Sequence, residues 1–115
     1  MKRVLSFLFG LTLLISAPLA AASVEGILVD KACSGETKTY DAAKAHSRDC
    51  ALMDDCKASG FGVVTKDGKF LKFDPAGDKM ALDALGKSSK GNNITVTVDG
   101  MVEGDSIKVT SLKLT

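Results

Sequence analysis

Residues 94–115 have the sequence ITVTVDGMVEGDSIKVTSLKLT. Apolar and polar side chains alternate over residues 94–98 and again over residues 107–110, on either side of Glu103-Gly104-Asp105. Alternation with a period of two is typical of strands that bury one face. Because the alternation slips by one residue near Thr110-Ser111, we expect a hairpin of two strands with a β-bulge at that point.

Three more strands are predicted upstream. Residues 61–65 and 69–73 are rich in β-forming side chains and flank Asp67-Gly68, which is a strong local signal for a hairpin. Residues Val24 to Asp30 contain the apolar run Ile-Leu-Val and predict a first strand. The chain therefore contains five predicted strands.

Two helices are predicted between these strands. Residues 41–57 are rich in Ala, Leu and charged side chains without Pro or Gly, which favours one continuous helix that begins at Asp41 and stops at Ser59-Gly60. Residues 78–90 carry one narrow apolar face and predict a second helix, after a turn at residues 74–77.

The order is thus strand, helical insertion (about residues 31–59), strand, strand, helix, strand, strand. Without the insertion this is β-β-β-α-β-β, the order of a five-stranded oligonucleotide/oligosaccharide-binding (OB) barrel. The chain resembles small exported bacterial OB-fold proteins in Gly26-x-x-Val29-Asp30, the Asp67-Gly68 hairpin and the glycine-punctuated V-x-V-x-G tail. The resemblance implies a mainly β domain with two helices and an OB-like barrel. It implies no functional residue, and a bare OB barrel lacks the cysteine-bearing insertion.

The N-terminal residues are typical of a secretory signal. Lys2 and Arg3 precede an apolar stretch over residues 4–15, and Pro18 and the small residues Ala20-Ala21-Ala22 follow. This pattern predicts a signal peptide over residues 1–22, cleaved before Ser23. We expect a periplasmic or extracellular protein with a single domain over residues 23–115 and no membrane anchor after cleavage.

Charge and composition argue against nucleic acid as a ligand. Loss of Lys2 and Arg3 leaves 13 basic and 14 acidic residues, and the only aromatic residues beyond the leader are Tyr40, Phe61, Phe70 and Phe73. Binding of single strands needs basic grooves and stacking rings. Phosphate-binding, dinucleotide and hydrolase motifs are also missing from the sequence. We therefore expect a binding module rather than an enzyme, with no partner identified.

The most informative side chains are Cys33, His46, Cys50, Met53 and Cys56. At about 100° per residue, a continuous helix over residues 41–57 places the last four within an arc of about 120°. Cys33, in the preceding loop, could fold over the same face.

Three interpretations of this cluster are open. The first is a structural or partner-binding domain stabilised by a disulfide between Cys33 and either Cys50 or Cys56, with one free thiol, because exported domains retain disulfides. A Cys50–Cys56 bridge is excluded in an unbroken helix, where the two residues are about 9 Å apart along the axis.

The second interpretation is a metal site. Cys33, His46, Cys50 and Cys56 form a Cys₃His set of the kind that binds zinc, and the thioether of Met53 as a replacement ligand would favour copper(I). The third interpretation is thiol redox or nucleophilic chemistry with a cysteine activated by His46. For that chemistry the sequence indicates no Asp or Asn that orients the imidazole.

Overall fold

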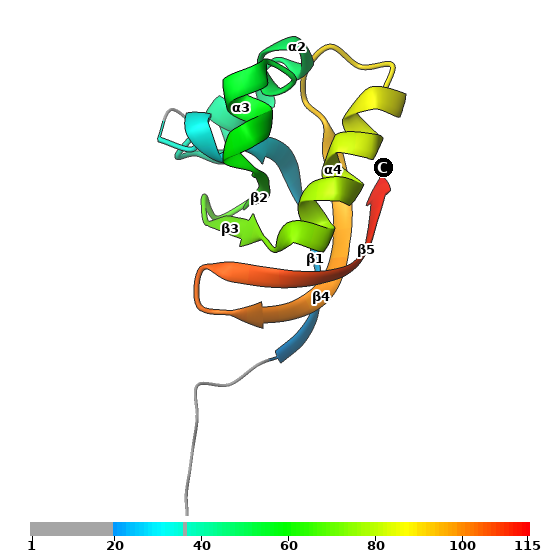
Figure 1. Cartoon of the computed structure of the whole chain (residues 1–115). Helices are drawn as coiled ribbons and strands as arrows, with labels where there is room; N and C mark the ends of the chain where they lie inside the picture. Colours follow the sequence, from blue (N-terminus) through cyan, green and yellow to red (C-terminus); the bar gives the residue numbers. More distant parts are fainter. Residues whose placement is uncertain (1–19, 36) are drawn as a thin grey trace, which may run out of the picture.

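The computed structural model describes residues 20–35 and 37–115, so residues 1–19 of the predicted signal peptide lie outside the described residues. Five strands form one mixed sheet accompanied by four α-helices (Figure 1). The elements are β1 (Ala20–Asp30), the 3₁₀-helix η2 (Lys31–Cys33), α1 (Tyr40–Lys44), α2 (Arg48–Ala51), α3 (Asp54–Ser59), β2 (Phe61–Thr65), β3 (Phe70–Phe73), α4 (Pro75–Lys87), β4 (Thr95–Glu103) and β5 (Ser106–Leu114). The mainly β character and all five predicted strands are confirmed.

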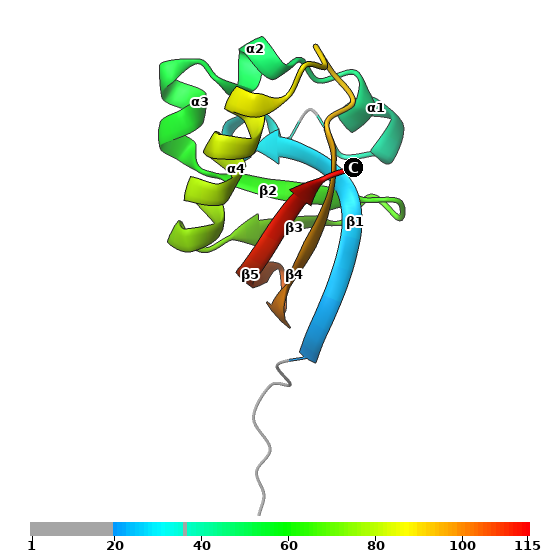
Figure 2. The ribbon, with the colours of Figure 1, turned by 90° about the vertical axis from the view of Figure 1, so that its right-hand side faces the viewer.

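The sheet closes on itself in the order β1-β2-β3-β5-β4, because the long strand β1 pairs with both β2 and β4. Ile27 lies opposite Val64 of β2 on one side and Thr95 of β4 on the other. The curve of β1 that this double pairing requires is visible in Figure 2. Gly26 lies in the part of β1 that pairs with both β2 and β4. A Cβ atom there would stand 2.3 Å from the Val64 carbonyl oxygen, so only glycine allows β1 and β2 to lie this close together.

The β4–β5 hairpin matches the alternation in the sequence. Asp99 pairs with Ser111, whereas the next residue, Gly100, pairs with Val109. Thr110 is therefore the extra residue of a bulge, which confirms the predicted slip in register. The Asp67-Gly68 hairpin between β2 and β3 is also confirmed.

Two hydrophobic clusters lie on opposite faces of β1. Leu28 belongs to the main core inside the barrel, which α4 covers with Ala81 and Leu85. Ile27 and Val29 point the other way and pack with Ala43 of α1. Successive side chains of a strand point to opposite faces. Asp30, the last residue of β1, is two residues after Leu28 and therefore lies on the same inner face of the barrel.

Helix α4 begins three residues before the predicted start at residue 78. Asp74 is its N-cap and accepts a hydrogen bond from the Gly77 amide at 3.1 Å, and Pro75 occupies the first helical position. Residues 74–77 therefore form the first turn of the helix rather than a separate turn. A cap followed by proline is a helix start signal, and the sequence interpretation missed it.

The predicted continuous helix over residues 41–57 is wrong. The segment forms three short helices, α1, α2 and α3, with extended backbone at Ser47 and Met53. The Ser47 hydroxyl accepts a hydrogen bond from the Cys50 amide at 2.9 Å. In a continuous helix that amide would instead donate to the backbone carbonyl four residues earlier. The Arg48 amide instead donates to the carbonyl of Gly91, 43 positions further along the chain, at 2.8 Å. The described residues thus contain four α-helices, not two.

Residues Ala20–Ala22 extend β1 and pair with Val102–Gly100 of β4. Cleavage before Ser23 would remove this end of the strand and keep the pairs from Ser23–Asp99 to Ile27–Thr95. None of the helices in the described part of the chain has the length and hydropathy that crossing a membrane requires.

Candidate metal centre

The candidate site is built around Asp30, at the point where β1 leaves the barrel. Its side chain is fully buried. One carboxylate oxygen, Oδ2, accepts the backbone amide of Cys33 at 3.1 Å and caps η2. The other, Oδ1, lies 2.6 Å from Nε2 of His46. Both oxygens of this buried carboxylate are therefore used, and they hold two of the predicted site residues.

His46 lies in the connection between α1 and α2, and its side chain is only 10% exposed. A carboxylate accepts hydrogen bonds but does not donate them, so with Asp30 as a carboxylate Nε2 is the donor in this contact. In the neutral imidazole, Nδ1 then keeps its lone pair. Among metal-binding histidines, a carboxylate on one ring nitrogen commonly prepares the other nitrogen for the metal.

Two thiols gather close to this imidazole. The Sγ atoms of Cys33 and Cys50 and a ring nitrogen of His46 all lie within 4.8 Å of one another. Cys33 comes from η2 and Cys50 from α2, whose first turn is fixed by the Ser47 cap. The break at Ser47 therefore does not disperse the cluster, because it sets the position of Cys50.

The third thiol completes the cluster from α3. Cys56 is 8% exposed, and its Sγ atom, the Sγ atom of Cys33 and a carboxylate oxygen of Asp30 lie within 4.8 Å of one another. Cys33 thus belongs to both groups. All four predicted ligands, Cys33, His46, Cys50 and Cys56, meet at one end of the barrel. Met53, the fifth candidate, is 59% exposed at the N-cap of α3.

Figures 1 and 2 both place α2 and α3 at the end of the barrel opposite the β4–β5 turn. Gly60 ends α3 with a φ of 87°, a conformation that glycine adopts without strain, and its carbonyl accepts the Lys31 amide at 2.8 Å. This contact ties the end of the insertion to η2. The insertion therefore begins and ends beside Asp30.

Burial and the nearby Asp30 carboxylate oppose ionisation of two of the thiols, those of Cys33 and Cys56. Burial, followed by the charge and hydrogen bonding of Asp30, raises the pKa of Cys33 to about 12. Burial and hydrogen bonding to Asp30 also raise the pKa of Cys56. The raised pKa values favour the protonated form of these two thiols, whereas a bound cation would reverse the local field and deprotonate its sulfur ligands.

No protein-family model matches the chain, and no curated protein or solved structure matches it either. The chemistry of the site is therefore inferred from its own side chains.

The sequence interpretation missed Asp30 as a site residue. It treated Asp30 only as the end of the first strand, although a carboxylate that follows Ile27-Leu28-Val29 and precedes Cys33 by three residues was a usable signal. An acidic residue is rarely fully buried unless it is paired. Its partner, His46, lies 16 positions away, in a segment whose predicted helix was wrong.

The three cysteines are free thiols in the structure. The predicted disulfide between Cys33 and Cys50 or Cys56 stays a prediction. The Sγ atom of Cys33 lies within 4.8 Å of the Sγ atom of Cys50 and of that of Cys56. The argument against a Cys50–Cys56 bridge from the rise of an unbroken helix no longer applies, because Met53 interrupts the segment.

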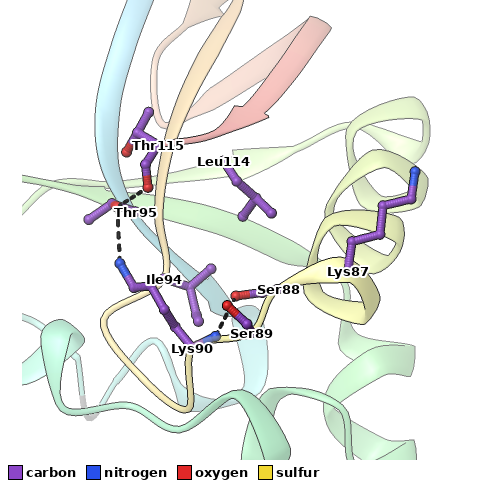
Figure 3. Close-up of a pocket in the computed structure, with 8 residues that line it drawn as sticks. All are labelled: Lys87, Ser88, Ser89, Lys90, Ile94, Thr95, Leu114 and Thr115. Carbon is purple, nitrogen blue, oxygen red and sulfur yellow. Dashed lines mark hydrogen bonds between the residues drawn. The ribbon is translucent and has the colours of Figure 1, made fainter.

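A separate pocket lies between the end of α4 and the ends of β4 and β5 (Figure 3). Its volume is about 190 Å³, below the range of about 300–1,000 Å³ that is usual for ligand pockets. Two of its polar side chains already bond within the protein: Lys90 Nζ lies 3.4 Å from Thr95 Oγ1, which donates to the Thr115 carbonyl at 3.1 Å. This pocket therefore does not compete with the cysteine cluster as a candidate site.

Proposed function

We propose that this protein is an exported OB-type domain that binds one transition-metal ion, zinc first, through Cys33, His46, Cys50 and Cys56. The observation that carries the proposal is the convergence of three thiols and one imidazole, from three helices and one connecting segment, around a buried carboxylate. Cys₃His is an established zinc ligand set. Binding, rather than catalysis, is the role we assign to the domain.

The distances support this assignment. In a tetrahedral zinc site with Zn–S bonds of about 2.3 Å, sulfur ligands stand about 3.8 Å apart. Ligand atoms of Cys33, His46 and Cys50 lie within 4.8 Å of one another, so they already approach this spacing. Cys56 groups with Cys33 and Asp30 rather than with His46 and Cys50, so as the proposed fourth ligand it has to move closer to those two side chains.

Asp30 has a supporting role in this proposal. Its Oδ1 atom fixes the ring of His46 through Nε2, and its Oδ2 atom fixes the backbone of Cys33. Both ligands are therefore oriented before the metal arrives. Such preorganisation commonly changes metal affinity by about 10- to 100-fold.

The position of Met53 is the reason why we prefer zinc over copper(I). Thioether ligands favour copper(I), but the Met53 side chain is largely exposed, and the remaining set of three thiolates and one imidazole suits zinc. Copper(I) remains the alternative soft ion for the same ligands.

The fold and the leader complete the proposal. The closed strand order β1-β2-β3-β5-β4, with α4 between β3 and β4, supports the OB assignment. The insertion occupies the β1–β2 connection, one of the two loops that border the binding face of OB barrels. The apolar leader supports export, and an N-terminus at Ser23 in the mature protein, measured by intact mass, tests that step.

The metal proposal is tested on reduced protein that comprises residues 23–115. One zinc ion per chain by elemental analysis after gel filtration is the expected result, with thiolate-to-metal charge-transfer absorption when cobalt(II) replaces zinc. Cys33→Ser, Cys50→Ser and His46→Ala should each reduce the stoichiometry or affinity, while Asp49→Asn, an exposed change on α2, should not. Folded, reduced protein that binds no stoichiometric metal would overturn the proposal.

A second candidate function is thiol chemistry, and one observation favours it. Asp30 provides the carboxylate partner for His46, and two thiols lie near the imidazole, as in a cysteine–histidine–aspartate nucleophile. The raised pKa of Cys33 opposes this function, because thiolate is the nucleophile. Alkylation rates as a function of pH separate the two: a thiol that titrates below pH 8 in metal-free protein would favour catalysis.

A further inference from the structure

We propose that oxidation of the cluster releases the metal, and that Cys33 is one member of every disulfide that forms within it. This inference rests on the proposed metal site and names its regulation. Its basis is the central position of Cys33, whose sulfur lies within 4.8 Å of both Cys50 and Cys56 in the two ligand groups.

The two other thiols do not share a group. Among the described residues, Cys50 groups with Cys33 and His46, whereas Cys56 groups with Cys33 and Asp30. A disulfide needs a sulfur–sulfur bond of about 2.05 Å, so the pairs that already lie close need the least rearrangement. Two alternative bridges, Cys33–Cys50 and Cys33–Cys56, therefore compete for the same sulfur.

Exposure determines where an oxidant enters. Cys33 and Cys50 are partly exposed, whereas Cys56 is buried. A solvent-borne oxidant consequently meets Cys33 or Cys50 first. If it reacts at Cys50, Cys33 is the neighbour that resolves the adduct; if it reacts at Cys33, either Cys50 or Cys56 can do so. Both routes end in a disulfide that includes Cys33.

The oxidant we assign is a small-molecule disulfide, RSSR. Cys33 or Cys50, after its thiol has lost a proton to solvent or in exchange for the bound cation, attacks one sulfur of RSSR, which forms a mixed disulfide and expels RS⁻. A second cysteine thiolate then attacks the protein sulfur of the mixed disulfide and expels the second RS⁻. Two protein thiols are oxidised by two electrons, RSSR is reduced to two RSH, and the protons come from the protein thiols or, in the loaded site, from solvent.

Disulfide formation removes two of the four proposed ligands. A disulfide sulfur carries no negative charge and is a poor ligand for zinc, so the remaining thiol and His46 cannot hold the ion tightly. The connections at Ser47 and Met53 have extended backbone between short helices, so Cys50 and Cys56 can approach Cys33 without bending a long helix. Reduction by an external thiol restores the binding form.

The experiment starts from reduced protein, residues 23–115, loaded with zinc and titrated with oxidised glutathione. Zinc release is followed with a chromogenic chelator, free thiols are counted after denaturation, and disulfides are assigned by peptide mass mapping. The expected result is one zinc released for two thiols lost, with Cys33 in every intramolecular bridge. The same mapping on metal-free protein gives the pairing independently of zinc.

Single variants sharpen the test. In their metal-free forms, Cys50→Ser should still form the Cys33–Cys56 bridge, and Cys56→Ser should still form Cys33–Cys50. Cys33→Ser should give glutathione adducts but no internal bridge. Circular dichroism of each reduced variant checks that the barrel is folded.

The outcomes separate the two proposals. Absence of zinc from the reduced protein, before any oxidant is added, counts against the metal site itself. If zinc binds, then a Cys50–Cys56 bridge in wild type or in Cys33→Ser overturns the assignment of Cys33. Zinc that stays bound to fully oxidised protein overturns release by oxidation.

Discussion

Oδ1 of Asp30 lies 2.6 Å from Nε2 of His46, and this contact joins the last residue of β1 to the connection between α1 and α2. Asp30 is fully buried and His46 nearly so. A buried carboxylate is costly unless it is paired and hydrogen-bonded. The pair therefore links the barrel to the insertion in the metal-free protein and orients the imidazole for the proposed ion.

Asp30→Asn should weaken zinc binding by about 10- to 100-fold, because the variant retains all four proposed ligands but loses the charge that orients His46. An amide nitrogen at the Oδ2 position would also face the Cys33 amide, a second donor, at a cost of about 1–3 kcal/mol. Competition with a zinc chelator measures the affinity. Asp49→Asn is the control, and an unchanged affinity in Asp30→Asn would exclude an orienting role for Asp30.

His46→Ala should destabilise the metal-free protein by about 3 kcal/mol, because it leaves the Asp30 carboxylate buried without its partner. Adding Asp30→Asn should recover part of that loss, since the double variant no longer contains an unpaired buried charge. Urea unfolding of the two single variants and the double variant gives the coupling free energy. Strict additivity would mean that the contact contributes nothing to folding.

Ser47→Ala and Thr39→Ala remove equivalent caps from neighbouring helices. Ser47 accepts the Cys50 amide, whereas Thr39 accepts the Ala42 amide in α1. Each substitution should lower the free energy of unfolding by about 1 kcal/mol. Only Ser47→Ala should also weaken zinc binding, because only that cap positions a proposed ligand. Equal zinc affinities for the two variants would argue against a role of the helix break in building the site.

Gly26→Ala and Gly86→Ala should change stability in opposite directions. A Cβ atom at Gly26 would clash with the backbone of β2, which should destabilise the barrel by about 2 kcal/mol or more. A Cβ atom at Gly86, an exposed position in α4, meets nothing within 4 Å, and alanine there should stabilise the helix by about 0.5–1 kcal/mol. Thermal unfolding of both variants tests the close β1–β2 contact that closes the sheet.

The acid limb of the stability curve should depend on Asp99. Hydrogen bonds from the hydroxyls of Ser23 and Ser111 lower the pKa of Asp99 below its ordinary value of 3.8. A carboxyl whose pKa is lower in the folded state stabilises that state above the unfolded-state pKa. This contribution disappears as the pH falls from that value through the folded-state pKa. Ser111→Ala should therefore flatten the loss of stability below about pH 4. Urea midpoints from pH 2 to 6 measure the effect, and parallel curves for wild type and variant would refute it.

Local patterns were sufficient for the strands and their hairpins. Alternation over residues 94–98 and the Asp67-Gly68 turn act between near neighbours, and the register slip at Thr110 is visible in the sequence itself. The start of α4 was also encoded locally, in Asp74-Pro75, but the turn signal of the same residues was given more weight. Such errors arise from competing local signals, not from missing information.

The site depended on contacts between residues far apart in the chain. Residue type alone pointed to Cys33, His46, Cys50 and Cys56, because thiols and imidazole are chemically distinctive wherever they lie. The breaks that place them required Gly91 and Asn92 to pair with the Ser47-Arg48 segment, and the role of Asp30 required His46 to return to the end of β1. Helix propensity acts over a few residues and is worth only tenths of a kcal/mol at each, whereas one buried carboxylate without a partner costs several. The long-range pairing therefore prevails, and the amino-acid order of residues 41–57 does not reveal it.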